Sequence, residues 1–184
     1  MKFLKTFITD VHIIDPTVFR DDRGYFLESF NLQEFEENIY PIKFVQDNES
    51  KSSNGVLRGL HFQKPPFDQA KLVRCVKGRV IDVAVDIRKG SPTYGKHVAV
   101  ELSGENKRQM FIPRGFAHGF AVLSETAIFA YKVDNNYVPE SDSGIRYDDK
   151  VLNIDWGLNE DEIKVSAKDE KLICFKDLDS PFEF

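Results

Sequence analysis

Cysteine and long apolar runs are scarce in this sequence, and each shortage excludes a class of protein. The 184 residues include two cysteines, Cys75 and Cys174, too few for a disulfide framework, so we expect both to be reduced in a cytoplasmic protein. No apolar run approaches the ~20 residues of a membrane-spanning helix. Lys5 and Asp10 interrupt the N-terminal stretch, which argues against a signal peptide. We therefore expect no membrane partner.

Positive charge is also in short supply. The chain carries 25 Lys and Arg residues against 30 Asp and Glu residues, a formal net charge of -5. A general nucleic-acid-binding surface is therefore not expected. A local anion pocket remains compatible with this balance, because a pocket depends on where a few basic residues lie.

The composition is that of one globular unit. Apolar residues make up 41% of the chain and charged residues 30%, which is typical of globular proteins. The length is enough for one domain with a sizeable core. We find no internal repeat, low-complexity segment or linker, so the sequence predicts a single domain over residues 1–184.

Helical patterns are rare, whereas short strand patterns recur at roughly ten-residue spacing with turn residues between them. One helix is expected over 31–39, with Asn31 as its cap and Glu34 three residues later as in a capping box. Polar turns or loops are expected at 50–55 and 139–149, with a helical turn or two near 159–163. The expected strands lie at 7–14, in a hairpin over 19–30, and at 44–48, 56–62, 69–76, 79–87, 97–102, 109–112, 119–123 and 126–133. The pattern predicts an all-β sandwich or barrel with a few short helices.

The strand at 56–62 carries both an arginine and a histidine. Strict alternation would place Arg58 and His61 on opposite faces. Gly59 lies between them, and glycine inside a strand often marks a bulge. A bulge here would turn both side chains into one cavity. The same three positions also fit an edge strand with a solvated arginine and a structural histidine.

Two segments have the spacing of cupin motifs. Residues 113–118 match the Pro-x-Gly-x-x-His pattern of the second motif. In the first motif, metal-binding members have His-x-His, then Glu, then Gly seven residues later. Here His61 and Gly78 match, but Gln63 replaces the second histidine and Lys71 replaces the glutamate. Metal binding needs neutral imidazoles and a carboxylate, so we predict a cupin-type jelly roll with no metal and a fixed positive charge in its cavity.

Seven stretches spread over nearly the whole chain resemble the dTDP-4-dehydrorhamnose 3,5-epimerase family: 19–26, 46–48, 57–63, 70–73, 90–95, 112–120 and 168–169. The resemblance implies a homodimeric jelly roll without a metal or organic cofactor. It also implies inversion of C3 and C5 in a 4-keto-6-deoxy sugar carried on dTDP, on the route to dTDP-L-rhamnose.

That chemistry needs a base, an acid on the opposite face and stabilisation of an enolate oxygen, because C3 and C5 both flank the C4 ketone. The resemblance implies His61 as the base, whose imidazole titrates near ~6.5, with Asp169 supporting the imidazolium. It implies Tyr131 as the acid and Lys71 beside the C4 oxygen. Taken alone, Tyr131 also fits an ordinary core tyrosine and Asp169 a helix cap.

The remaining site residues implied by the resemblance bind the nucleotide and sugar. Guanidinium groups match phosphate oxygens, so arginines are the candidates for the pyrophosphate. The implied residues are Arg58 and Arg23 for pyrophosphate, Tyr137 stacked on thymine with Phe26 as a second wall, Glu28, Gln46 and Asn48 for base and ribose, His118 for sugar or phosphate, and Lys168 for the phosphate side. Asp142 stands where many relatives have Glu, which leaves its role open. Arg23, Phe26 and Glu28 are expected to reach in from the partner chain.

Two alternatives to the 3,5-epimerase remain compatible with the sequence. One is an epimerase that acts at C3 or C5 alone, which would need the same catalytic residues. The other is a cupin that binds a sugar nucleotide without catalysis, and such a protein would not need a base, an acid and an oxyanion cation together.

Overall fold

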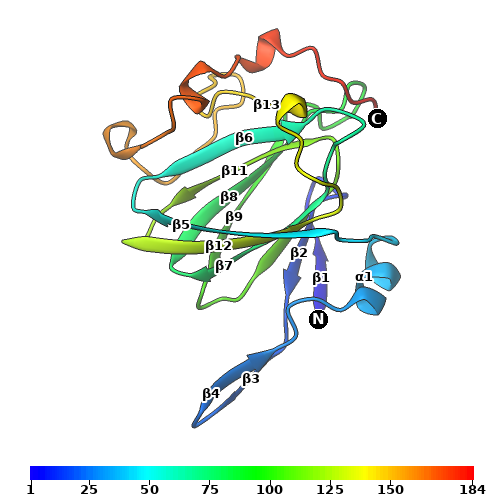
Figure 1. The fold of residues 1–184 in the computed structure, drawn as a ribbon, viewed down its shortest axis with the longest axis vertical. Helices are drawn as coiled ribbons and strands as arrows, with labels where there is room; N and C mark the ends of the chain where they lie inside the picture. Colours follow the sequence, from blue (N-terminus) through cyan, green and yellow to red (C-terminus); the bar gives the residue numbers. More distant parts are fainter.

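The chain is built mainly of short antiparallel strands, which the computed structural model describes over residues 1–184 (Figure 1). The strands are β1 (Lys2–Lys5), β2 (His12–Asp15), β3 (Val18–Asp21), β4 (Gly24–Leu27), β5 (Gln46–Ser53), β6 (Leu57–Gln63), β7 (Lys71–Lys77), β8 (Arg79–Asp86), β9 (His97–Ser103), β10 (Gln109–Ile112), β11 (Phe116–Val122), β12 (Thr126–Val133) and β13 (Asp142–Gly144). One sheet has the order β1-β2-β10-β7-β12-β5 and the other β13-β6-β11-β8-β9. The all-β prediction is confirmed.

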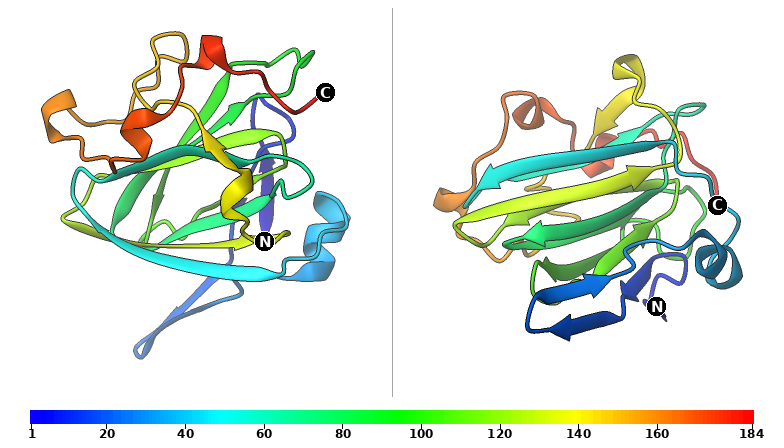
Figure 2. Two further views of the ribbon diagram at one scale, coloured as in Figure 1. Left: turned by 45° about the horizontal axis from the view of Figure 1, so that its top comes forward. Right: turned by 60° about the horizontal axis from the view of Figure 1, so that its bottom comes forward.

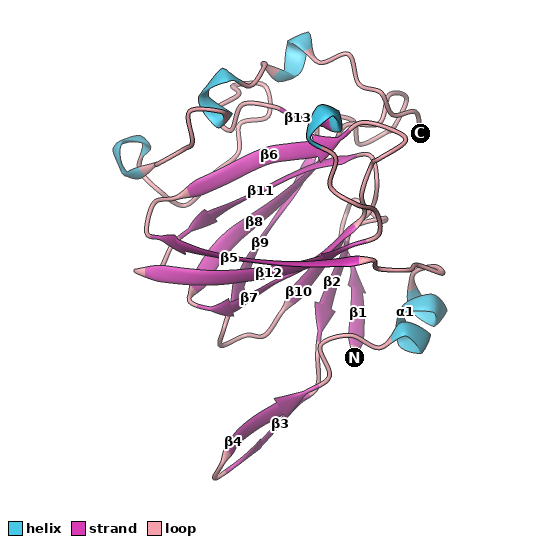
Figure 3. Cartoon of the chain, in the orientation of Figure 1, coloured by secondary structure: helices cyan, strands magenta, loops and turns pink.

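Helical structure is limited to one short helix and four single turns (Figure 3). The helix is α1 (Leu32–Asn38), and the 3-10 turns are η1 (Pro139–Ser141), η2 (Glu160–Glu162), η3 (Asp169–Lys171) and η4 (Phe175–Asp177). Asn31 caps α1 as predicted, accepting a hydrogen bond from the Glu34 amide at 3.2 Å. The Glu34 carboxylate instead binds the N-terminal amine at 2.7 Å, so the reciprocal half of the expected capping box does not form.

Apolar side chains form three clusters around the sheets. The cluster between the two sheets takes alternate residues of facing strands, including Val73 of β7, Val80 and Ala84 of β8, and Phe129 of β12. A second cluster lies on the other face of the five-stranded sheet, where the C-terminal segment covers it. A third packs α1 against the six-stranded sheet through Phe35. Strand β8 therefore contributes apolar side chains to the clusters on both faces of its sheet.

Three expected boundaries were wrong because pairing partners decided them. Of the strand expected at 7–14, only residues 12–14 are extended, as part of β2, whereas residues 6–11 form a turn that joins β2 to β1. The polar turn expected at 50–55 begins later, because β5 pairs with β12 along its whole length to Ser53. The loop expected at 139–149 contains β13, which pairs with β6. In the second and third cases, polar sequence concealed a strand that pairing with a neighbouring strand stabilises.

The hairpin predicted over 19–30 forms and stands away from the sandwich (Figures 1 and 2). It pairs β3 with β4 and exposes large rings, with Phe19 at 62% and Phe26 at 67%. Exposed aromatic side chains on a projecting element are typical of an interaction surface.

Among the helices, none has the length and apolar content to span a membrane.

Candidate active site

The bulge predicted at Gly59 is present. His61 pairs with His118 of β11, and Arg58 pairs with Phe120, so β6 uses three steps where β11 uses two. Gly59 has a φ of +130°, and a Cβ there would lie 2.5 Å from the backbone of β11. The bulge brings Arg58 and His61 to the same inner face, and both line one cavity. This prediction is confirmed.

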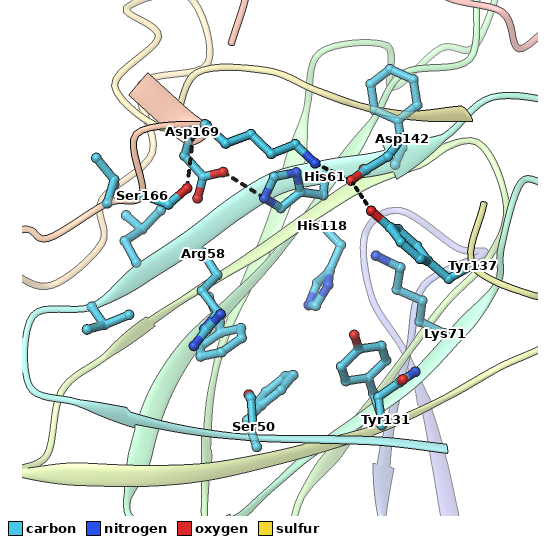
Figure 4. Close-up of a pocket in the computed structure, with 18 of the residues that line it drawn as sticks. Ser50, Arg58, His61, Lys71, His118, Tyr131, Tyr137, Asp142, Ser166 and Asp169 are labelled. Atoms are coloured by element: carbon cyan, nitrogen blue, oxygen red, sulfur yellow. Dashed lines mark hydrogen bonds and ion pairs between the residues drawn. The ribbon is translucent and has the colours of Figure 1, made fainter. Parts of the chain in front are cut away.

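The cavity has a volume of about 600 Å³ and lies between the two sheets (Figure 4). The stacked rings of Phe120 and Phe129, 4.1 Å apart, form part of its apolar lining. Most of the predicted site residues also line it, namely Asn48, Arg58, His61, Lys71, His118, Tyr131, Tyr137, Asp142, Lys168 and Asp169. Residues separated by over a hundred positions in sequence are thus brought together in one cavity.

Four predicted residues do not line this cavity in the single chain. Arg23 and Phe26 lie on the projecting hairpin around a separate hollow, where Arg23 pairs with Asp21 at 2.6 Å. Glu28 accepts a hydrogen bond from Asn31 at 2.9 Å. Gln46 lies just outside the cavity and donates to the Asn48 side chain at 2.8 Å. Within one chain, the hairpin residues therefore cannot contribute to the site.

His61 is paired with Asp169 across two elements. Its Nε2 lies 3.0 Å from Asp169 Oδ1, and the His61 side chain is 26% exposed against 5% for Asp169. Nδ1 of the same ring is buried without a hydrogen-bond partner, so it can still accept a proton. Burial opposes ionisation of Asp169, but the hydrogen bond and charge of His61 outweigh it, and the carboxyl pKa lies below its usual value. The carboxylate is therefore charged at neutral pH and faces the imidazole.

Tyr131 faces this pair from the opposite sheet. It lies on β12, whereas His61 lies on β6, and Figure 4 shows the two side chains projecting toward the same space. Burial raises the pKa of the Tyr131 phenol, although Arg58 acts to lower it. The phenol is therefore protonated at neutral pH and can donate a proton or a hydrogen bond.

Lys71 places a positive charge in the same cavity from β7. Burial lowers the pKa of its ammonium group to about 8, while the charges of Asp82 and Asp142 act to raise it. The group is therefore still mostly charged at neutral pH and loses its proton in mildly alkaline solution.

Asp142 joins two other predicted residues at the cavity. Its Oδ2 accepts a hydrogen bond from the Tyr137 hydroxyl at 3.1 Å and also pairs with the Lys168 ammonium group. Asp142 therefore ties together the two segments that carry Tyr137 and Lys168.

A second histidine–carboxylate pair lies deeper, and sequence reasoning missed its acidic member. His118 Nε2 lies 3.0 and 3.1 Å from the two oxygens of Asp82, which is fully buried on β8. The sequence does carry one signal for this residue. Asp82 alternates with Val80 and Ala84, which places its carboxylate on the inner face of the strand. Only the pairing of β8 with β11 shows what that carboxylate faces.

The residues at the cupin metal positions do not fit a metal ion. The Gln63 amide donates to the carbonyls of Phe67 and Asn136 at 2.6 and 3.1 Å, and its oxygen accepts from the Val138 amide at 2.6 Å. Lys71 supplies positive charge where a ligand carboxylate would stand. No group of three or more His, Cys, Asp or Glu side chains is placed to hold a metal. The Gln63 amide instead anchors the loop that precedes β13.

We therefore predict that a chelator leaves turnover unchanged. The measurement is the rate of the enzyme treated with excess EDTA and then dialysed, beside untreated enzyme. A metal-dependent epimerase or isomerase treated in the same way is the control for chelation. Loss of activity that a divalent ion restores would contradict the inference drawn from Gln63 and Lys71.

A jelly roll that encloses an imidazole–carboxylate pair, a phenol and an ammonium group defines a class, that of acid–base enzymes with the cupin fold. Comparison with known proteins identifies the family within this class. A family profile described as dTDP-4-dehydrorhamnose 3,5-epimerase matches residues 5–177. A relative of that name from Escherichia coli K12 is 54% identical over 179 residues, which cover 97% of this chain and 96% of the relative. The chain belongs to the dTDP-4-dehydrorhamnose 3,5-epimerase family.

Solved structures support both the family and the fold class. A Legionella pneumophila dTDP-6-deoxy-D-glucose-3,5-epimerase in complex with dTDP-4-keto-L-rhamnose has a TM-score of 0.95 and 48% identity, covering 100% of this chain and 98% of that one. The predicted cupin-type jelly roll is therefore confirmed. A Streptomyces niveus relative named dTDP-4-dehydrorhamnose 3-epimerase is 40% identical over 150 residues, which cover 81% of this chain and 72% of the relative.

Proposed function

We propose that this protein inverts C3 and C5 of dTDP-4-dehydro-6-deoxy-D-glucose to give dTDP-4-dehydro-L-rhamnose, in dTDP-L-rhamnose biosynthesis. The observation that carries the proposal is that His61 and Tyr131 enter one cavity from opposite sheets, with Lys71 beside them. Inversion needs groups on both faces of the reacting carbon, and this geometry supplies them. The relatives named above support the substrate.

The proposed reaction proceeds by proton transfer next to the ketone. His61 removes the proton from C3 or C5, and Asp169 stabilises the imidazolium that forms. The electron pair of the broken C–H bond forms the C=C bond of the enolate, and the carbonyl π pair moves to the C4 oxygen, where the Lys71 ammonium group stabilises the negative charge. Tyr131 then returns a proton to the carbon from the opposite face. Solvent restores the protonation of both residues before the next inversion.

The nucleotide part of the substrate needs separate contacts. Arg58 and Lys168 line the cavity and are the proposed pyrophosphate ligands. His118 is proposed to contact the sugar or phosphate. Tyr137 is half exposed at the cavity and is the proposed stacking surface for thymine. Gln46 and Asn48 are proposed for the base and ribose.

The proposal is tested by incubating the enzyme with dTDP-4-keto-6-deoxyglucose in heavy water and following C3 and C5 by NMR. Deuterium at both carbons of an inverted product supports the 3,5-epimerase. Label and inversion at one carbon alone would show a single-position epimerase, for which the relative from Streptomyces niveus is a precedent. Binding without deuterium uptake would show a sugar-nucleotide-binding protein and overturn the enzymatic proposal.

We also propose that the protein acts as a cytoplasmic homodimer. Both cysteines are free thiols, which supports a reducing compartment. Arg23, Phe26 and Glu28 lie on or beside a projecting hairpin outside the cavity of their own chain. In the proposed dimer, each hairpin reaches the cavity of the other subunit, so the two sites are shared.

Mixed dimers test this sharing. We expect inactive His61→Ala and inactive Arg23→Ala subunits to regain about a quarter of wild-type activity after random exchange, because half the dimers are hybrids and each hybrid holds one intact site. The matched control mixes His61→Ala with Lys71→Ala, whose defects lie in the same cavity and should not complement. No recovery in verified hybrids would place each site within one chain.

A further inference from the structure

Asp82 is a buried carboxylate for which the proposed reaction has no role. It is 0% exposed and lies on β8 between Val80 and Ala84, on the apolar face that points between the sheets. It is not among the residues that line the cavity. A buried carboxylate is costly unless charged or polar groups compensate it, so its partners indicate what it does.

The first partner is His118, which does line the cavity. Both oxygens of Asp82 lie within 3.1 Å of His118 Nε2. A carboxylate accepts hydrogen bonds, so this nitrogen carries a proton. The imidazole is also stacked on Phe129, with ring centroids 6.1 Å apart and planes at 21°. Two independent contacts therefore hold the ring, and the carboxylate selects the tautomer with hydrogen on Nε2.

The second group that Asp82 influences is Lys71, which lines the same cavity as His118. Burial lowers the pKa of its ammonium group to about 8, and Asp82 is the first of the two carboxylates that oppose this change. The other is Asp142, which is already paired with Lys168. Asp82 is thus the nearby negative charge that has no lysine or arginine of its own.

The groups that face these residues come from several strands. The charge of Asp82 acts on Lys71 and Cys75 of β7, and its carboxylate is hydrogen-bonded to His118 of β11. His61 on β6 and Lys71 both act against a positive charge on His118. Burial raises the pKa of the Cys75 thiol to about 11, so this group is neutral. Removing the Asp82 charge would therefore leave the positive groups of this region with less compensation.

We propose that Asp82 is a positioning residue of the epimerase, which holds His118 in the Nε2–H tautomer and supplies a buried negative charge behind the part of the cavity that Lys71 lines. The expected effect on kcat rests on the proposed function. The expected effect on the charge of Lys71 does not. Asp82 acts from behind the cavity wall and does not touch the substrate.

The test is Asp82→Asn, which keeps the shape and an oxygen that can accept from His118 Nε2 but removes the charge. Loss of one nearby opposite charge moves a pKa by roughly one unit or more. We expect the alkaline limb of the kcat profile to move to lower pH by about that amount, with roughly fivefold lower kcat at pH 8 and a much smaller loss at pH 6. The matched control, Glu101→Gln, removes an exposed carboxylate from the neighbouring strand β9 and should leave the limb in place.

Direct titration of Lys71 separates this inference from the proposed function. NMR of lysine labelled with carbon-13 at Cε, assigned with Lys71→Met, needs no turnover. A lower Lys71 midpoint in Asp82→Asn supports the inference even if no epimerisation is found. An unchanged midpoint, or an equal loss of kcat at every pH, overturns it. If Asp82→Asn does not fold, nitrogen-15 NMR of wild-type histidines decides instead: a proton on His118 Nδ1 with none on Nε2 would overturn the inference.

Discussion

Replacing Lys71 with methionine is expected to lower kcat by roughly 10²–10³-fold, which is the usual loss when one group that stabilises an oxyanion is removed. The methionine side chain keeps much of the volume and apolar contact of the lysine stem. It removes only the ammonium group, which the proposed reaction uses when negative charge develops on the C4 oxygen. An interaction made mainly in the transition state changes kcat far more than KM.

The pH dependence of kcat in the wild-type enzyme should report the protonation state of Lys71. The pKa of Lys71 is lowered to about 8, and the ammonium form is present below that pH and lost above it. Activity should therefore fall as the pH rises through about 8, whereas the residual rate of Lys71→Met should lack this limb. Lys77→Met is the matched control, because Lys77 ends the same strand on the exposed surface. An unchanged kcat with a raised KM would make Lys71 a substrate-binding residue instead.

Local sequence patterns predicted the part of the site that depends on one strand. Gly59 between Arg58 and His61 indicated a bulge, because glycine weakens a regular strand and is found inside one mainly at bulges and close backbone approaches, although the same residues also fitted an edge strand. The substitution of Lys71 at a metal-ligand position predicted a positive charge in the cavity, and the structure places it there. Such predictions succeed because they depend on the local backbone of one strand or on the position of one residue in a motif, and not on contacts between distant strands.

Contacts between distant strands could not be predicted in the same way. Asp82 looked like one polar position in an alternating strand until β8 paired with β11 and placed it against His118. The strand β13 has the sequence Asp-Ser-Gly, which carries no strand signal and forms only because the edge of β6 is available. Asp142 consequently meets Lys168, 26 residues away, through sheet pairing and a turn.

Variants of the two proposed proton-transfer residues, His61 and Tyr131, should differ in whether they retain solvent deuterium uptake. Without the His61 imidazole no enolate forms, so His61→Asn should abolish both epimerised product and solvent deuterium uptake at C3 and C5. The asparagine still offers a hydrogen-bonding group to Asp169, which limits the disturbance of the carboxylate. Proton NMR in heavy water measures both quantities in one sample. Deuterium uptake at wild-type rate in this variant would assign the base to another residue.

Tyr131→Phe should uncouple exchange from inversion. The phenylalanine ring still fills its place against the cavity, His61 still removes a proton, and Lys71 still stabilises the enolate. For this outcome the imidazolium must exchange its proton with solvent through the sugar site and then return it to the face from which it came. Deuterium should therefore enter the substrate while epimerised product falls steeply. Tyr94→Phe, which changes a tyrosine packed against the C-terminal segment outside the cavity, is the matched control.

Each alternative outcome of the Tyr131→Phe experiment has a distinct meaning. Inversion at near wild-type rate would show that water or another residue delivers the second proton. Loss of exchange in a variant that still binds substrate would show that the phenol is needed before the enolate forms, for example to orient the ketone against Lys71. In that case the assignment of His61 and Tyr131 to opposite faces would fail, although the two side chains enter the cavity from opposite sheets. Exchange without inversion is therefore the one result that requires both a base at His61 and a separate proton donor at Tyr131.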